Sequence, residues 1–200
     1  MAQDLAISCK CGEVRGMLHD VGPDEGGRYV CYCSDCRDFI RVLGRGGDVL
    51  DANGGTSVYQ TRVGKLELTV GKDRLATLHM TEKPTTRWYS TCCNTPFFNT
   101  TNKAKPAFLS VITACCDEDR RDAVLGPSRG DILAKEAEPP LDQPNTVSTL
   151  KLVRSFLPRL LKDTFGKGWK QSPLFDPETR EPIAKPRRVS QEERALLDSV

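Results

Sequence analysis

The chain has 200 residues, of which 38% are hydrophobic and 28% are charged, and its formal net charge is +2. These values are ordinary for a compact domain with one hydrophobic core. A charge this close to neutral argues against a strongly basic surface, so no nucleic acid is expected as a partner. Because no apolar run approaches the length of a membrane span, no such span is expected. The N-terminus lacks the pattern of a secretory signal, which predicts a reducing, cytoplasmic location.

Short segments of alternating polar and apolar residues, separated by Gly, Asn and Pro, occupy the first part of the chain. This period-two pattern predicts a mainly β fold of short antiparallel strands. We expect the strands at residues 5–8, 13–18, 28–32, 57–62, 65–70, 74–80, 87–89 and 107–113. One short helix is expected to start near Cys36, with Ser34 as the N-cap and with Cys36, Phe39, Ile40 and Leu43 on the inner side.

The composition changes after Cys116, so we divide the chain into residues 1–116, a helix and linker at 117–145, and a C-terminal helix and extended tail at 146–200. A short helix is expected at residues 117–125, where Gly126-Pro127 ends it, and another at 191–197. Residues 149–165 have apolar residues at helical spacing, interrupted by Pro158, and basic residues on the other side. We expect this helix to pack on the sheet or on a second copy of the chain, with membrane-surface association a minor alternative.

Nine cysteines are concentrated in a few short segments. One pair is Cys9 and Cys11, a triad is Cys31, Cys33 and Cys36, and a further pair is Cys92 and Cys93. Thiolate sulfur is a soft ligand that suits Zn²⁺, and a Cys-x-Cys or Cys-x-x-Cys turn delivers two sulfurs at the separation that a tetrahedral ion needs. The cysteine pattern therefore predicts zinc.

Disulfides, inert core cysteines and a redox dithiol are the alternatives to zinc. Cysteines one residue apart on a strand point to the same face and could bridge only each other, and the adjacent Cys92 and Cys93 could pair only through a strained ring. An odd number of cysteines in a chain without an export signal indicates a reducing compartment, where metal binding or catalysis is the commoner use of cysteine. None of the alternatives accounts for all three clusters.

The order of the cysteine motifs resembles that of the glutathione-dependent formaldehyde-activating enzyme (GFA) family, which includes centromere protein V. The matching segments are Cys9-x-Cys11-Gly12, Cys31-x-Cys33-x-x-Cys36-Arg37 and Cys93-Asn94-Thr95-Pro96, within roughly the first 115 residues. The resemblance implies an all-β fold called a β-tent. It also implies a structural zinc held by the first and last cysteine pairs, and a second, catalytic zinc held by the triad Cys31, Cys33 and Cys36.

The chain departs from this family pattern at the late cysteine pair. The family usually has Cys-x-x-Cys there, and the alignment puts Ser90 at the first of these positions. A serine hydroxyl is a poor zinc ligand, so Cys92 is the candidate substitute beside Cys93, provided that the backbone bends between these neighbours. A three-cysteine site, or a packed cluster without zinc, is the alternative. Cys115 and Cys116 are expected to be buried or reactive thiols rather than ligands.

Three protein thiolates leave one position of a tetrahedral zinc open, which is typical of a catalytic site. By the resemblance, glutathione or another small thiol would bind there through its sulfur and react with an aldehyde such as formaldehyde. Zinc with three thiolates carries an excess negative charge. Arg37 and Arg41 are candidates to compensate that charge or to bind a carboxylate of glutathione, and a solvated helix face is the alternative for both.

Two functional hypotheses follow from the sequence. The first is a zinc-dependent carbon–sulfur lyase-like enzyme that acts on a glutathione or other small-thiol aldehyde adduct, with one structural zinc and a second, labile zinc at the triad. The second is a non-catalytic zinc-binding module that mediates a protein interaction.

Overall fold

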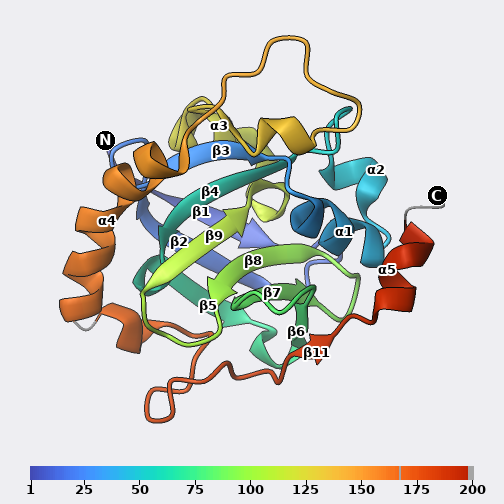
Figure 1. Ribbon diagram of the computed structural model, residues 1–200. Helices are drawn as coiled ribbons and strands as arrows, with labels where there is room; N and C mark the ends of the chain where they lie inside the picture. Colours follow the sequence, from blue (N-terminus) through green and yellow to red (C-terminus); the bar gives the residue numbers. More distant parts are fainter. Residues whose placement is uncertain (167, 198–200) are drawn as a thin grey trace.

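The computed structural model describes residues 1–166 and 168–197, and in this part of the chain two β-sheets form the centre of the molecule (Figure 1). The smaller sheet is antiparallel, with the strand order β1-β2-β5. The larger sheet has the order β10-β3-β4-β9-β8-β7-β6-β11, antiparallel except for its two outermost pairs. The strands are β1 (Gln3–Ser8), β2 (Arg15–Val21), β3 (Gly27–Cys31), β4 (Thr56–Arg62), β5 (Leu66–Val70), β6 (Leu75–His79), β7 (Thr85–Ser90), β8 (Pro96–Thr101), β9 (Phe108–Ile112), β10 (Asp131–Ile132) and β11 (Arg187–Arg188).

Five α-helices and several short 3₁₀ turns are described around the sheets. The helices are α1 (Ser34–Val42), α2 (Gly46–Val49), α3 (Glu118–Leu125), α4 (Thr149–Phe165) and α5 (Gln191–Leu197). The mainly β class with a C-terminal helix is therefore confirmed, and so is the helical assignment of residues 149–165. The helix continues through Pro158, an exposed position. None of the described helices has the length and apolar character needed to cross a membrane.

The main core lies where the two sheets face each other. Alternate residues of β1 enter it, as the period-two pattern requires, so that Leu5 and Ile7 are buried while their neighbours are not. Trp88 and Phe98 enter it from the larger sheet, where they are paired across β7 and β8. A second, smaller core contains Phe39 and Ile40 of α1, together with Cys31 and Cys36. Two of the three triad cysteines are thus part of the apolar packing.

Strand β8 was not predicted, because its sequence does not alternate. Five of its six residues are buried, since it lies in the middle of the larger sheet with packing on both faces. Its sequence, Phe97-Phe98 followed by Asn99-Thr100-Thr101, shows neither alternation nor a long apolar run, and Pro96 at its start looks like a breaker. The two-residue strands β10 and β11 were also not predicted.

The predicted N-cap of α1 was wrong by one residue. Ser34 is the first helical residue, and Cys33 is the cap, with its Sγ accepting a hydrogen bond from the Cys36 amide at 3.4 Å. The cysteine sulfur takes the place of the usual hydroxyl or carboxylate oxygen at the positive end of the helix dipole. The first turn of α1 therefore depends on two of the triad cysteines, Cys33 and Cys36.

The segments after Cys116 pack on the domain that precedes them. β10 extends the larger sheet beside β3. At the other edge, β11 extends it beside β6 (Figure 1). Asp117 caps α3 by accepting from the Asp119 amide, and its own amide donates to the Ala6 carbonyl of β1.

His19 of β2 bridges β1 and β5, the outer strands of the smaller sheet. From this bridge we predict a pH-dependent contribution to stability. Its ring nitrogens lie 2.7 Å from Glu67 and 3.1 Å from Asp4, and these carboxylates raise the pKa of His19, Glu67 first. A histidine whose pKa is raised in the folded state stabilises the folded protein fully at pH values below its unfolded pKa of about 6.5. This stabilisation is lost as the pH rises through the folded pKa. We expect His19→Gln to lower Tm by about 1–2 °C at a mildly acidic pH and by less at an alkaline pH, because the pairs are half-exposed and screened.

Thermal unfolding of both proteins by circular dichroism at the two pH values measures this difference. His79→Gln is the control of opposite sign. Burial lowers the pKa of His79, so the native histidine destabilises the folded chain increasingly as the pH falls, and replacing it costs less at the acidic pH than at the alkaline pH. An equal Tm difference for His19→Gln at both pH values would contradict the bridge.

Candidate metal centres

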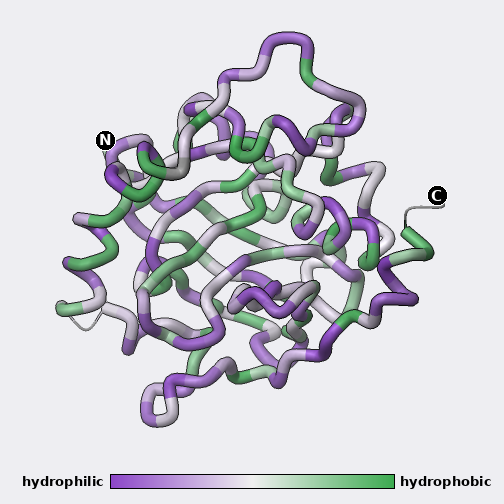
Figure 2. The backbone as a smooth tube through the Cα atoms, viewed as in Figure 1, coloured by the Kyte–Doolittle hydropathy of each residue, from purple (hydrophilic) through white to green (hydrophobic). Residues whose placement is uncertain are grey.

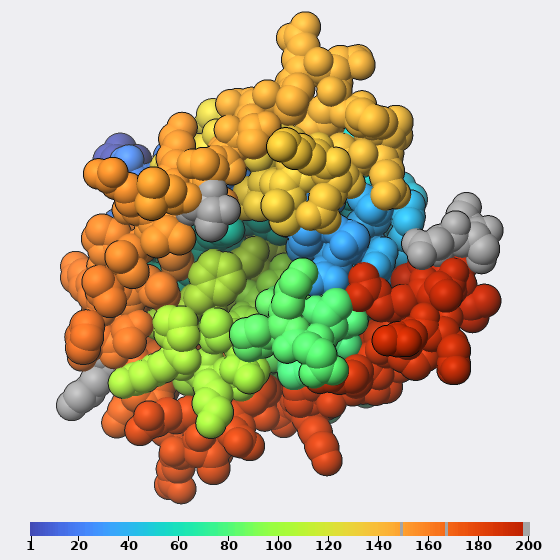
Figure 3. All heavy atoms as spheres, viewed as in Figure 1, coloured from blue at the N-terminus to red at the C-terminus, as the bar shows by residue number. Residues whose placement is uncertain are grey.

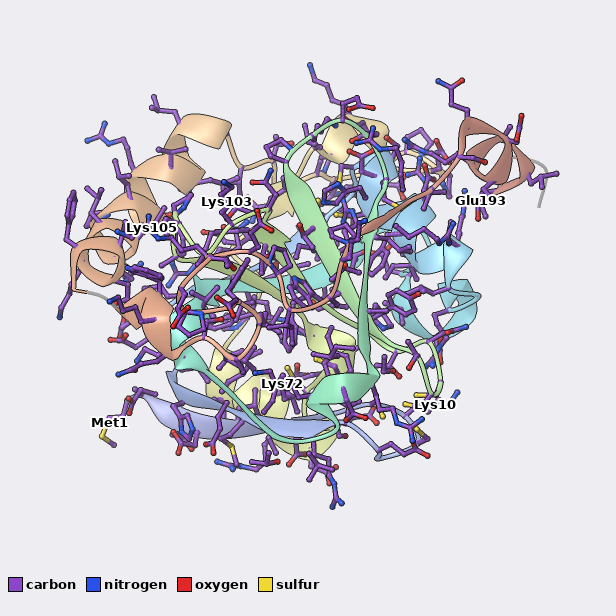
Figure 4. The ribbon with its side chains drawn as sticks, turned by 90° about the horizontal axis from the view of Figure 1, so that it is seen from below. Met1, Lys10, Lys72, Lys103, Lys105 and Glu193 are labelled. Atoms are coloured by element: carbon purple, nitrogen blue, oxygen red, sulfur yellow. The ribbon has the colours of Figure 1, made fainter. Side chains whose placement is uncertain are left out.

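Four cysteine sulfurs meet at one end of the molecule, where the turn after β1 reaches the turn after β7. Cys9 and Cys11 come from the first turn, and Cys92 and Cys93 come from the second. The Sγ of Cys92 lies 3.3 Å from that of Cys11 and 3.7 Å from that of Cys9, and all four sulfurs are within 4.8 Å of one another. Figure 4 labels Lys10 in this turn, with sulfur atoms drawn in yellow beside it.

Both adjacent cysteines of the late pair reach this cluster because the chain turns between β7 and β8. Residues 91–93 form the turn, and Asn94 has the left-handed φ of 53°. Cys92 therefore stands in the cluster. The Ser90 hydroxyl has a different role, since it accepts from the Thr95 amide at 3.1 Å and lies 3.5 Å from the Cys93 sulfur. Ser90 fixes the turn that presents the sulfurs.

Cys93 is the thiol of this cluster that is set up to ionise. Burial raises its pKa, but hydrogen bonds from the hydroxyls of Thr95, 3.2 Å from the sulfur, and of Ser90 outweigh burial, and the pKa falls to about 5. The guanidinium of Arg45 also donates to the Cys93 carbonyl at 2.9 Å. Metal ligation requires thiolates, so the surroundings of Cys93 favour the ligating form of this one cysteine, whereas the pKa of Cys92 is raised, by burial first.

The separations between the sulfurs fit a tetrahedral ion. Zn–S bonds of about 2.3 Å place the sulfurs of a tetrahedral site about 3.8 Å apart. Four of the Sγ–Sγ distances in the four-cysteine cluster run from 3.3 Å for Cys11–Cys92 to 3.9 Å for Cys92–Cys93, and all lie within 4.8 Å. These four cysteines form a closed donor set of the kind that structural zinc sites use.

The triad lies where β3 ends and α1 begins. Cys31 is the last residue of β3, Cys33 caps α1, and Cys36 lies in its first turn. The sulfurs of Cys31 and Cys33 are 3.4 Å apart, and all three lie within 4.8 Å of one another. Cys31 and Cys36 are buried, whereas Cys33 is partly exposed. Hydrogen bonds from the Cys31 and Cys33 thiols hold the pKa of Cys36 well below its usual range, and Arg87 adds to this effect.

Arg87 of β7 is the buried cation beside the triad, and it was not predicted from the sequence. Its Nη1 lies 3.5 Å from the Cys36 sulfur and 3.1 Å from Asn99 Oδ1, and its guanidinium lies 5.6 Å from the Phe39 ring centre. The side chain is 4% exposed. Burial alone would lower the pKa of Arg87, but Cys36 raises it. An arginine inside a predicted strand, next to Trp88, was the available signal of a buried charge.

Of the two arginines expected to act at the triad, Arg37 has other partners, and the role expected of Arg41 stays a prediction. The Arg37 guanidinium is committed elsewhere, since it donates to the Glu136 carbonyl at 2.8 Å and pairs with Glu138 at 2.7 Å. Arg41 lies one turn further along α1 and is partly exposed. Arg37 therefore anchors the linker to α1, whereas Arg87 is the cation in contact with a triad sulfur, and the role expected of Arg37 toward a substrate carboxylate stays a prediction.

The C-terminal tail reaches back to the same helix. Arg194 of α5 pairs with Asp38 and lies 3.3 Å from Asp35, two buried carboxylates of α1, and Lys83 pairs with Asp35 at 2.9 Å. Val189, just before α5, is buried in the small core that contains Cys31 and Cys36. Figure 3 shows the tail in red, packed against the blue residues of α1.

The fold and the clusters define a mainly β protein with two groups of cysteines that are suited to metal binding. The chain belongs to a family of unknown function, DUF6151, whose model matches residues 1–185. Among solved structures, a crystal structure of a Rhodobacter sphaeroides protein from a structural genomics project is similar, at 19% identity over 62% of this chain and 96% of that chain, with a TM-score of 0.42. A likeness this weak carries no functional argument. No curated protein matches.

Removing the Arg87 charge is expected to destabilise the protein. Arg87→Met leaves the Cys36 thiolate and Asn99 without their buried partner, so we expect a loss of about 3 kcal/mol in the free energy of unfolding. Arg15→Met, at an exposed position of β2, is the control and is expected to change little.

Urea unfolding of Arg87→Met, Cys36→Ala and the double variant measures the coupling between the two side chains. We expect the double variant to lose at least about 1 kcal/mol less than the sum of the single variants. Strict additivity would show that Arg87 acts through packing and not through its charge next to Cys36.

Proposed function

We propose that this protein is a zinc-dependent carbon–sulfur lyase-like enzyme that acts on adducts of an aldehyde with glutathione or another small thiol, on a fold of the GFA β-tent type. The observation that carries the proposal is the triad: three cysteine sulfurs within 4.8 Å of one another, with the buried Arg87 beside them. Three thiolates make an incomplete donor set for a tetrahedral ion, and an incomplete set is what a catalytic site needs.

The two clusters would have different roles. Cys9, Cys11, Cys92 and Cys93 would hold a structural zinc in a complete set of four ligands, and Cys31, Cys33 and Cys36 would hold a second zinc with one position free. When bound there, zinc supplies a lowered pKa for a substrate thiol that occupies the free position. The recorded sulfur separation of 3.4 Å between Cys31 and Cys33 is compatible with this ion.

The exposure and the charge of the residues around the triad support the proposal that a thiol is the substrate. Cys33 is the partly exposed member, so the substrate sulfur would enter on its side, and Cys31 and Cys36 lie in the apolar core that excludes water. Three thiolates on a divalent cation leave an excess negative charge, and a substrate thiolate adds another. Arg87 offsets this charge from inside the protein.

The reaction is a reversible addition that needs no oxidant. In the forming direction, the substrate sulfur attacks the carbonyl carbon of the aldehyde and makes the C–S bond. The electron pair of the C=O π bond moves to the oxygen, which takes up a proton and becomes the hydroxyl of an S-hydroxyalkyl thiol. In the lyase direction, the hydroxyl loses that proton, the C=O bond re-forms and the C–S bond breaks.

The zinc content per chain, measured by elemental analysis with and without glutathione, tests the proposal. We expect about one zinc in protein purified without added metal, and about two when glutathione and stoichiometric zinc are supplied together, because the substrate completes the second site. Cys33→Ala is expected to stay at about one zinc under both conditions. Cys116→Ser is the matched control, since Cys116 is a buried cysteine outside both clusters, and it is expected to behave like the parent protein.

Formation of S-hydroxymethyl glutathione from formaldehyde and glutathione, followed by NMR, is the second measurement on the same variants. A constant single zinc, with no thiol binding and no acceleration of adduct formation, would exclude the enzyme and favour the non-catalytic zinc module. A Cys33→Ala variant that gains the second zinc with glutathione and binds the thiol as the parent protein does would equally exclude the triad as the site.

A further inference from the structure

Helix α4 exposes a row of large apolar side chains to solvent. The exposed fractions are 68% for Leu150, 48% for Val153, 42% for Leu157, 44% for Leu161 and 80% for Phe165. Their spacing of three or four residues places them along one side of the helix, over its whole length. In Figure 2, hydrophobic segments in green recur along α4 at the edge of the molecule. An apolar row of this length on the surface indicates an interaction site.

This row is separate from the face by which α4 packs on the protein. Phe156 is buried, and its ring meets Phe108 of β9 edge-on at 5.7 Å. Near the end of the helix, Asp163 pairs with the buried Arg62 of β4 at 3.1 Å. The packing face is therefore already occupied, and the exposed row borders it, since Val153 and Leu157 line one cavity together with Phe156.

The charges around the exposed row are positive. Lys151, Arg154 and Lys162 of α4 are exposed, while Asp163, the one acidic residue in the sequence of the helix, is committed to Arg62. Past the end of α4, three more cations surround the buried Trp169: Lys105, Lys170 and Arg180 lie within 4.8–5.6 Å of its ring centre. Figure 4 shows Lys103 and Lys105 on the same side of the molecule as α4. A partner must therefore be both apolar and anionic.

A second copy of the chain fits these charges poorly, because two such faces would bring like charges together. A peptide fits the adjoining cavity poorly. This apolar cavity of about 300 Å³ lies between α4 and the sheet, and Gln60 is the single polar residue in its lining, so the backbone groups of a peptide would lack partners there. Hydrocarbon chains need no such partners, and phosphate headgroups match the lysines and arginines.

We propose that α4 lies on an anionic lipid surface, with Leu150, Leu157, Leu161 and Phe165 inserted among the acyl chains and with Lys151, Arg154 and Lys162 against the phosphates. This is the behaviour of an interfacial amphipathic helix, which combines apolar burial with attraction to anionic lipids. It is independent of the proposed chemistry at the cysteine triad.

Co-sedimentation of the full chain with vesicles tests this surface. One set of vesicles contains phosphatidylcholine alone, and the other contains phosphatidylcholine mixed with phosphatidylglycerol. We expect binding to the anionic set, weakened by salt, and little binding to the neutral set. The triple variant Leu150→Gln, Leu157→Gln, Leu161→Gln is expected to bind at least about tenfold more weakly. The matched control is Val70→Gln with Ile183→Gln, which replaces exposed apolar residues elsewhere, at 45% and 38% exposure, and is expected to bind normally.

Circular dichroism and thermal unfolding are the controls for folding of the variants. We expect the variants to fold, because the substituted positions are exposed. Absence of binding by the parent protein, equal binding to both vesicle sets, or normal binding by the triple variant would each overturn the proposal. A concentration-dependent dimer in sedimentation equilibrium that the triple variant abolishes, without vesicle binding, would assign the surface to a second copy instead.

Discussion

The meeting of two distant turns is the constraint on which the rest of the structure depends. Cys9 and Cys92, 83 residues apart in the chain, bring their sulfurs to 3.7 Å, and this contact joins the end of the smaller sheet to the end of the larger one. The Lys10 amide donates to the Thr95 hydroxyl at 3.0 Å across the same junction. The core between the sheets is closed at this end by polar and sulfur contacts rather than by further apolar side chains. An ion bound by four thiolates would stabilise the folded chain directly, since the unfolded chain cannot assemble the site.

Strand β7 links this junction to the triad. Arg87 near its middle reaches the Cys36 sulfur, and Ser90 at its end supports the turn that carries Cys92 and Cys93. One strand therefore positions both the turn of the four-cysteine cluster, through Ser90, and the cation beside the triad, through Arg87. A register shift between Trp88 and Tyr89 lies between these two positions, where the strand passes from one cluster to the other.

The sequence was sufficient for features whose signals are local. The helix at Thr149–Phe165 followed from apolar spacing, and the triad followed from its short motif, whereas the meeting of the first and last cysteine pairs was expected from the family resemblance. Features that depend on neighbours distant in the chain were not accessible. Arg37 adjoins Cys36 in sequence, but a helix turns successive side chains by about 100°, so it points to the linker while Arg87, 51 residues from Cys36, supplies the charge. Strand β8 was missed because burial on both faces removes alternation.

The charges at the start of α1 give the C-terminal tail its physical role. Asp35 and Asp38 are buried on the helix that also holds Cys33 and Cys36, so carboxylates and thiolates are concentrated in one small region. Buried like charges are unfavourable unless cations are brought to them. Lys83 and Arg194 meet the two carboxylates, which leaves Arg87 to face the sulfurs. Arg194 lies beyond the residues that the family model covers, so this part of the compensation is contributed by a segment outside the family's matched region. The tail is therefore an electrostatic component of the triad's surroundings, because Lys83 pairs with Asp35 and the cation that meets the buried Asp38 is Arg194 of the tail.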